Sequence, residues 1–167
     1  WLTLYHWDLP QAVEDRGGWV NRDTSYRFRD YSMAVYDALH DRVPTWTTLN
    51  EPWCSSFLSY TAGVHAPGHR SIREGMLASH HLLLGHGLAL EAMRDRQNES
   101  SIAHDLGITI NLGVMRPLNE TSEADRNAAR KIDGQFNRWF LDPVFRGSYP
   151  ADAVEDIHAV RPRSRGR

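Results

Sequence analysis

The chain has 167 residues, a length that suits one domain of ordinary size. Hydrophobic residues make up 41% and charged residues 24%, which indicates a globular protein and excludes a wholly disordered, collagen-like or coiled-coil chain. Nineteen Lys and Arg against 21 Asp and Glu give a net charge of −2, so we expect neither a nucleic acid nor an anionic membrane as partner.

The cysteine content and the first residues bear on where the protein works. A single cysteine, Cys54, cannot form an intramolecular disulfide, which favours a reducing compartment, and we expect the cytoplasm. No stretch approaches the roughly 20 apolar residues of a membrane span. Residues 1–6 are not a signal peptide, and the chain begins without Met inside a predicted strand. We therefore expect it to be part of a longer protein.

Hydrophobic spacing predicts three strands and three helices. In chain order these are a strand over 2–5, a helix over about 23–41, a strand over 45–49, a helix over about 72–96, a strand over 108–112 and a helix from about 122 to 143. Pro44 ends the first helix, and Ser71 and Glu74 have capping-box spacing before the second. Residues 53–70 are expected to form a long loop.

The order βαβαβα predicts the fold class. Strands that alternate with helices long enough to cross over form a parallel sheet covered by helices. A (β/α)₈ TIM barrel needs about 250 residues and eight such units, and this chain supplies about three. The prediction is therefore an α/β fold with a parallel sheet, which is either an open sheet or part of a (β/α)₈ barrel. No glycine-rich phosphate-binding motif follows a predicted strand, so no nucleotide is expected.

Polar residues follow the carboxyl end of each predicted strand. His6 and Trp7 follow the first, Asn50 and Glu51 the second, and Asn111 lies at the end of the third. Active sites of parallel α/β folds are built at these strand ends. These five residues are therefore the candidate site.

Glu51 is the candidate catalytic residue. Trp46 and Trp53 would provide apolar surroundings that disfavour its ionised form, as a general acid requires. Asn50 offers a neutral amide to a sugar hydroxyl. Pro52 excludes the α region for Glu51, which predicts extended backbone there. Because strand alternation turns neighbouring side chains to opposite faces, we predict a bend or bulge that brings Asn50 and Glu51 to one pocket.

Each candidate also has a structural interpretation. Glu51 could be an ordinary ion-paired loop acid. His6 and Trp7 could bind and stack on a pyranose, but a buried histidine and a core tryptophan are common. Asn111 could be only a turn former. Residue spacing by itself leaves these alternatives open.

Histidine pairs do not make a metal site. His65 and His69 stand four apart, but Pro67 and Gly68 interrupt helical geometry between them. The histidines within 80–86 also lack a carboxylate or thiolate to complete a ligand set. We expect no metal and no cofactor.

The end of the chain differs from the rest. Arginine recurs at every second position from Arg161 to Arg167 without aromatic residues. This pattern is typical of a solvated, disordered end. We predict an α/β domain over residues 1–150 and a basic, disordered tail over 151–167.

Several sequence blocks together resemble one enzyme family. They are Leu4–Gln11, Gly17–Trp19, Trp46–Trp53, Gly63–Gly68, Gly107–Asn111 and Phe140–Pro143. In this order they resemble glycoside hydrolase family 1, the retaining enzymes of β-glucosidase type on a TIM barrel. The resemblance covers nearly the whole chain to about residue 150.

The resemblance implies roles for individual residues. Glu51 would be the acid/base carboxylate at the end of the family's fourth strand, and Asn50 would bind the sugar 2-hydroxyl. His6, with Trp7 beside it, would contact the sugar from the third strand. Residues 63–68 would belong to the loop that flanks the aglycone entrance. The predicted strands would be strands three to five of eight.

The sequence also departs from the family pattern. The family's nucleophile is a Glu in an Ile/Val-Thr-Glu-Asn-Gly block, which this sequence does not contain. A retaining mechanism needs two carboxyl groups about 5 to 5.5 Å apart. We therefore expect part of a retaining β-glucosidase that hydrolyses terminal β-linked glucose or galactose from small glycosides, inactive without the rest of the barrel. The alternative is a non-catalytic carbohydrate-binding or scaffold half-barrel.

Overall fold

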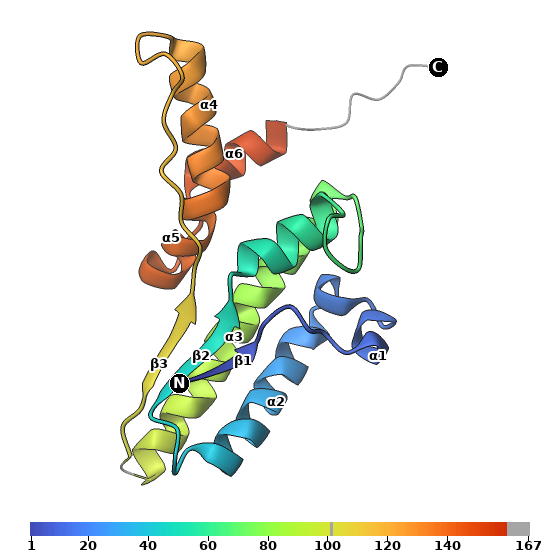
Figure 1. The fold of residues 1–167 in the computed structure, drawn as a ribbon, viewed down its shortest axis with the longest axis vertical. Coiled ribbons are helices and arrows are strands. Elements are labelled where there is room, and N and C mark those ends of the chain that lie inside the picture. The colour runs from blue at the N-terminus through green and yellow to red at the C-terminus, as the bar shows by residue number, and fades with distance from the viewer. Residues whose placement is uncertain (101, 160–167) are drawn as a thin grey trace. The chain divides into compact units, whose positions relative to one another are not determined.

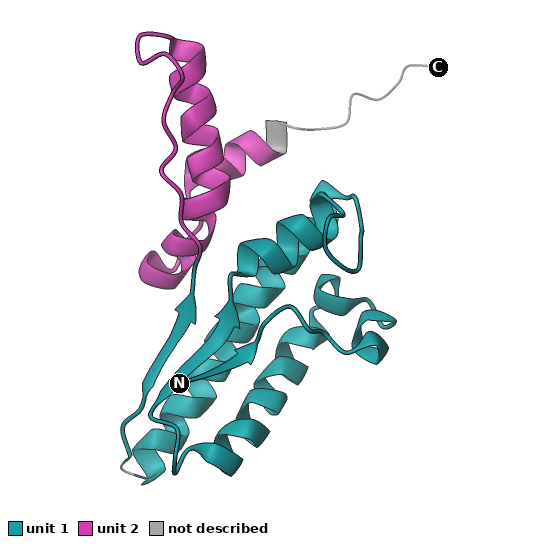
Figure 2. Ribbon diagram, in the orientation of Figure 1, with its two compact units in different colours: residues 1–110 teal, residues 111–167 magenta. Residues whose placement is uncertain are grey.

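A computed structural model describes residues 1–100 and 102–159. Contacts divide the chain into two compact units, residues 1–110 and residues 111–167 (Figure 2).

The first unit is an α/β layer structure (Figure 1). Its elements are β1 (Leu2–Tyr5), α1 (Gln11–Glu14), η1 (Gly18–Val20), α2 (Asp23–Leu39), β2 (Thr45–Asn50), η2 (Cys54–Thr61), α3 (Ile72–Ser100) and β3 (Asp105–Thr109). The strands form a parallel sheet in the order β1-β2-β3, and α2 and α3 pack side by side on it. The predicted parallel α/β arrangement is confirmed.

The central strand pairs regularly with β1 but not with β3. Tyr5 pairs with Leu49 on one side. On the other side the register shifts between Thr47 and Asn50, so that Asn50 faces Thr109. Such an irregularity bends the strand and redirects its last side chains. The predicted irregularity at this strand end is confirmed, and the approach of Asn50 and Glu51 to one pocket stays a prediction.

A buried core lies between the sheet and the two long helices. Trp46 is 1% exposed and contacts Tyr36 of α2, with ring centroids 4.9 Å apart. The Trp46 indole donates to the carbonyl oxygen of Val43, before β2 begins. Trp46 therefore belongs to the core and does not flank Glu51, contrary to our prediction. The cause is strand alternation and length, because Trp46 lies near the opposite end of β2.

A histidine of α3 is buried behind β2. The ring of His86 lies 2.7 Å from Oγ1 of Thr48, which donates to the carbonyl oxygen of Gly107. Burial lowers the pKa of His86 to about 4.

This lowered pKa predicts a loss of stability in mild acid. The pKa is about 4 in the folded state and 6.5 ordinarily, so below pH 6.5 the unfolded chain binds a proton that the folded chain does not. Stability contributed by His86 is present above pH 6.5 and falls by about 3 kcal/mol on acidification to pH 4. Urea unfolding across this range should show the loss, and His86→Gln should flatten the curve. An unchanged slope in that variant would contradict the assignment.

Three features differ from prediction, two in the first unit and one in the second. The segment predicted as a loop contains η2, which has π-type helical turns from Cys54 to Thr61. The last strand lies at Asp105–Thr109, three residues earlier than predicted, because Asp105 N donates to the carbonyl oxygen of Pro44 and starts the pairing there. Pro143 does not end its helix.

The second unit consists of helices that follow one another closely. They are α4 (Glu123–Asp133), η3 (Gly134–Arg138), α5 (Trp139–Arg146) and α6 (Ala151–Ala159). Ser122 caps α4 by accepting from Asp125 N. Gly147, with φ 69°, ends α5 in the left-handed region that favours glycine.

Ion pairs hold α6 against the preceding helices. Arg130 contacts Asp152 at 2.5 Å and Asp156 at 2.8 Å, and Arg138 contacts Asp152 at 2.6 Å and Asp133 at 2.7 Å. Hydrogen bonds from these arginines hold the pKa of Asp152 well below its usual range. The predicted disordered tail is therefore wrong for residues 151–159. Its arginine-rich part, from Arg161, lies outside the described residues.

Candidate active site

Residues at the carboxyl ends of β1 and β2 come together as predicted. Nδ2 of Asn50 donates to Nε2 of His6 at 3.1 Å. The indole Nε1 of Trp7 donates to the carbonyl oxygen of Asn50 at 2.9 Å. Parallel pairing brings these residues to one edge of the sheet although they are far apart in sequence. His6, Trp7 and Asn50 thus form one hydrogen-bonded cluster.

Two residues of the candidate site have unusual backbone geometry. Trp7 has φ 73° and Glu51 has φ 45°, a region that costs non-glycine residues about 1 to 3 kcal/mol each. Such strain persists only where surrounding contacts hold it, and it is concentrated at functional sites.

The extended backbone predicted for Glu51 is wrong. The chain turns directly from β2 into a helical turn, in which Cys54 N donates to the carbonyl oxygen of Glu51 at 2.9 Å. Glu51 N also donates to the carbonyl oxygen of Thr109 in β3. At this junction between strand and helix Glu51 has φ 45°, so Pro52 does not hold the preceding residue in the extended region.

The carboxyl group of Glu51 has a thiol as neighbour. Sγ of Cys54 donates to Oε2 of Glu51 at 3.3 Å. Burial, followed by the hydrogen bond and charge of Glu51, raises the pKa of the Cys54 thiol to about 12. Cys54 is therefore a neutral hydrogen-bond donor at physiological pH, not a nucleophile.

An aromatic surface extends from the cluster. Trp7 is 37% exposed, and its ring lies 5.0 Å from that of His6 and 5.2 Å from that of His65. Sequence reasoning considered His65 only as a metal ligand, although its block was part of the family resemblance. His69 is instead 2.9 Å from Glu74 Oε2. Exposed aromatic faces of this kind can stack on the apolar face of a sugar.

A small cavity lined by Trp7 is also lined by residues that sequence reasoning did not select. It has a volume of about 70 Å³, and its lining includes Tyr5, Glu14 and Tyr60. The Tyr60 hydroxyl donates to Oε2 of Glu14 at 2.5 Å, and Trp19 Nε1 donates to the Tyr5 hydroxyl at 3.0 Å. Burial raises the pKa of Tyr5 to about 12, so its hydroxyl stays protonated. These bonds join η1 to β1 and η2 to α1.

The remaining candidate, Asn111, is the first residue of the second unit. It lies two residues after β3 and is half-buried. The structure therefore assembles His6, Trp7 and Asn50 within the first unit, with Glu51 next in the chain, and Asn111 belongs to the second unit.

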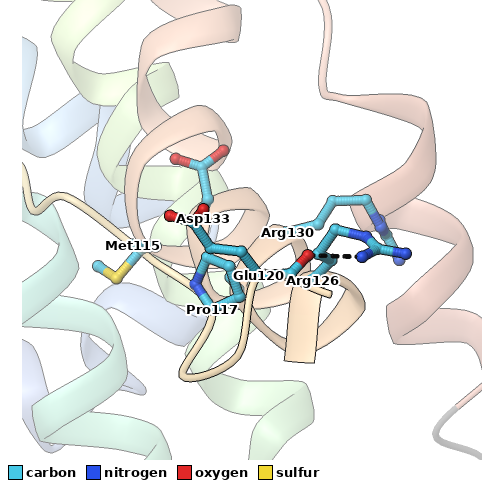
Figure 3. Close-up of a pocket in the computed structure, with 7 residues that line it drawn as sticks. Met115, Pro117, Glu120, Arg126, Arg130 and Asp133 are labelled. Atoms are coloured by element: carbon cyan, nitrogen blue, oxygen red, sulfur yellow. Dashed lines mark hydrogen bonds between the residues drawn. The ribbon is translucent and has the colours of Figure 1, made fainter. Parts of the chain in front are cut away.

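A surface hollow of the second unit is not a comparable site. It has a volume of about 620 Å³, and Met115, Pro117 and Glu120 are among its lining residues (Figure 3). Its arginines are engaged within the unit: Arg126 donates to the carbonyl oxygen of Glu120, and Arg130 is paired with the aspartates of α6. The hollow is thus part of the ion-pair framework.

Within residues 1–100 and 102–159, no group of three or more His, Cys, Asp or Glu side chains is placed to hold a metal ion. Within the same residues, no helix combines the length and the apolar character needed to cross a bilayer.

The sequence was compared with curated proteins. It is 48% identical over 153 residues to thermostable β-glucosidase B of Thermobispora bispora. The match covers 92% of this chain and 30% of that protein. It is 44% identical over 154 residues to β-glucosidase A of Acetivibrio thermocellus, covering 92% of this chain and 33% of the relative. The chain thus spans about a third of the length of these relatives.

Solved structures resemble the fold closely. A psychrophilic β-glucosidase from Micrococcus antarcticus has a TM-score of 0.89 and 52% identity, covering 94% of this chain and 32% of that one. The family 1 β-glucosidase of Thermotoga maritima has a TM-score of 0.85 and 37% identity, covering 97% of this chain and 35% of that one. The parallel sheet and its helices are therefore a partial TIM barrel.

The match to a family model extends past the boundary predicted at residue 150. The model of glycosyl hydrolase family 1 matches residues 1–164. Taken with the strand-end cluster and the structural likeness, this match shows that the chain belongs to glycosyl hydrolase family 1.

Proposed function

We propose that this chain supplies the acid/base side of a retaining β-glucosidase active site. Glu51 is the proton donor, and His6, Trp7 and Asn50 bind the sugar of a small β-glycoside. The observation that carries the proposal is the cluster of His6, Trp7 and Asn50 at the strand ends, with Glu51 next in the chain. The β-glucosidases to which the chain is similar support the same activity.

The chemistry requires Glu51 to act twice. In the first step its protonated carboxyl group gives a proton to the glycosidic oxygen, while a second carboxylate attacks the anomeric carbon. In the second step the Glu51 carboxylate takes a proton from water, which cleaves the glycosyl-enzyme intermediate. The sequence contains no block of the family's nucleophile pattern, so we place the second carboxylate in other parts of the barrel.

The neighbouring residues orient the sugar. The Asn50 amide and His6 imidazole offer hydrogen bonds to hydroxyl groups, and the bond from Trp7 to the Asn50 carbonyl oxygen holds the two strand ends together. The rings of Trp7 and His65 offer apolar faces to the pyranose or its aglycone.

Activity assays on the chain alone and on a chimera test this proposal. The 167-residue chain alone should not release nitrophenol from nitrophenyl β-glucoside. A chimera in which the chain replaces the matching third of Thermobispora bispora β-glucosidase B should do so. Hydrolysis by the chain alone would overturn the proposed incompetence. A folded chimera that binds glucose saturably without turnover would favour the binding or scaffold alternative.

A further inference from the structure

The side chain of Cys54 is fixed against one oxygen of Glu51. Cys54 is 6% exposed, and its Sγ lies 3.3 Å from Glu51 Oε2. The backbone closes the same turn, because Cys54 N donates to the Glu51 carbonyl oxygen. Ser59 Oγ donates to the Cys54 carbonyl oxygen, which ties the turn to the rest of η2. The thiol is thus a buried donor held in place by its own helix.

The contact between the thiol and Oε2 determines which oxygen of Glu51 carries the acid proton. A thiol has one proton to donate, and a protonated carboxyl group has one carbonyl oxygen and one hydroxyl. The oxygen that accepts from the thiol is favoured as the carbonyl oxygen, because a proton on that oxygen would compete with the S–H donor. The other oxygen then carries the acid proton.

We propose that Cys54 is a positioning residue that holds Glu51 Oε2 and thereby assigns the transferable proton to Oε1. This inference rests on the proposed acid/base role of Glu51. When the glycosidic C–O bond breaks, the proton on Oε1 passes to the leaving oxygen, and the second carboxylate supplies the electron pair for the new bond. Glu51 becomes a carboxylate, and Cys54 keeps its proton throughout. In the second step, Oε1 takes a proton from water.

The kinetic test uses leaving groups that differ in their need for an acid. An alkoxide leaving group requires protonation, whereas dinitrophenolate departs without it. In the chimera, Cys54→Ala should lower kcat/KM for methyl β-glucoside roughly fivefold to tenfold, the cost of one neutral hydrogen bond. The value for dinitrophenyl β-glucoside should stay unchanged. Cys54→Ser, which keeps a donor, should recover most of the loss, and Cys54→Val, which keeps the volume, should not.

The outcomes separate this inference from the proposed function. Equal losses on both substrates, or full activity in Cys54→Ala and Cys54→Val, would overturn the positioning role. If Glu51→Gln itself shows no dependence on the leaving group, the acid/base proposal fails instead.

A spectroscopic readout does not depend on turnover. The chain has a single cysteine, so its S–H stretching band belongs to Cys54 alone. The hydrogen bond should place this band at a lower frequency than that of a thiol without an acceptor, and Glu51→Ala should raise it. The matched variant Glu91→Ala, on the exposed side of α3, should leave it in place. A band that does not respond to Glu51→Ala would overturn the contact.

Discussion

Glu51→Gln in the chimera should lower kcat/KM for methyl β-glucoside by about 10²- to 10⁴-fold, the usual contribution of a positioned general acid. The amide keeps the size of the side chain but has no acidic proton to give to the leaving oxygen. Substrate binding should change little, because the cluster of His6, Trp7 and Asn50 remains. The effect should appear in steady-state kinetics with alkyl and dinitrophenyl glucosides, and should be smaller for the latter.

The control for this prediction is Glu91→Gln, which makes the same chemical change at an exposed position on α3. It should leave both substrates unaffected. Retention of full activity in Glu51→Gln would exclude Glu51 as the proton donor and favour its interpretation as an ordinary loop acid.

Trp19→Ala should destabilise the first unit by about 3 to 5 kcal/mol. Trp19 is 1% exposed, and its ring centroid lies 5.4 Å from that of Tyr5 and 5.8 Å from that of Phe28. The substitution leaves a large cavity and removes the indole donor from the Tyr5 hydroxyl. Urea unfolding followed by fluorescence or circular dichroism would measure the loss.

Trp1→Ala is the matched control for that variant. Trp1 is 84% exposed, and its Nε1 donates to Thr47 Oγ1. Its removal should cost about 1 kcal/mol. Equal losses in the two variants would show that the aromatic cluster around Trp19 does not carry the stability assigned to it.

Much of the fold was predictable because it depends on local patterns. The spacing of apolar residues predicted β1, β2 and α2 to within two residues, since each pattern follows the period of its own element. The segment around Phe57 was harder. Its Ser-rich sequence lacks a clear helical stripe, and it becomes helical by packing against α3.

Tertiary contacts also overrode local signals near the end of the chain. Alternating arginines suggested disorder from residue 151 onward, but Arg130 and Arg138 hold Asp152 and so stabilise α6. No property of the local sequence shows which aspartate an arginine twenty residues away will meet.

The sequence alone determined the family, the parallel α/β class and the residues that follow each strand, because these depend on motif order and hydrophobic period. Only the tertiary structure decided how those residues are arranged. The left-handed turn at Glu51, the thiol at its Oε2 and the hydrogen bond from Trp7 to Asn50 arise where the sheet ends and a helix begins. Their geometry follows from contacts made only after folding, between groups whose separation and direction no local pattern encodes.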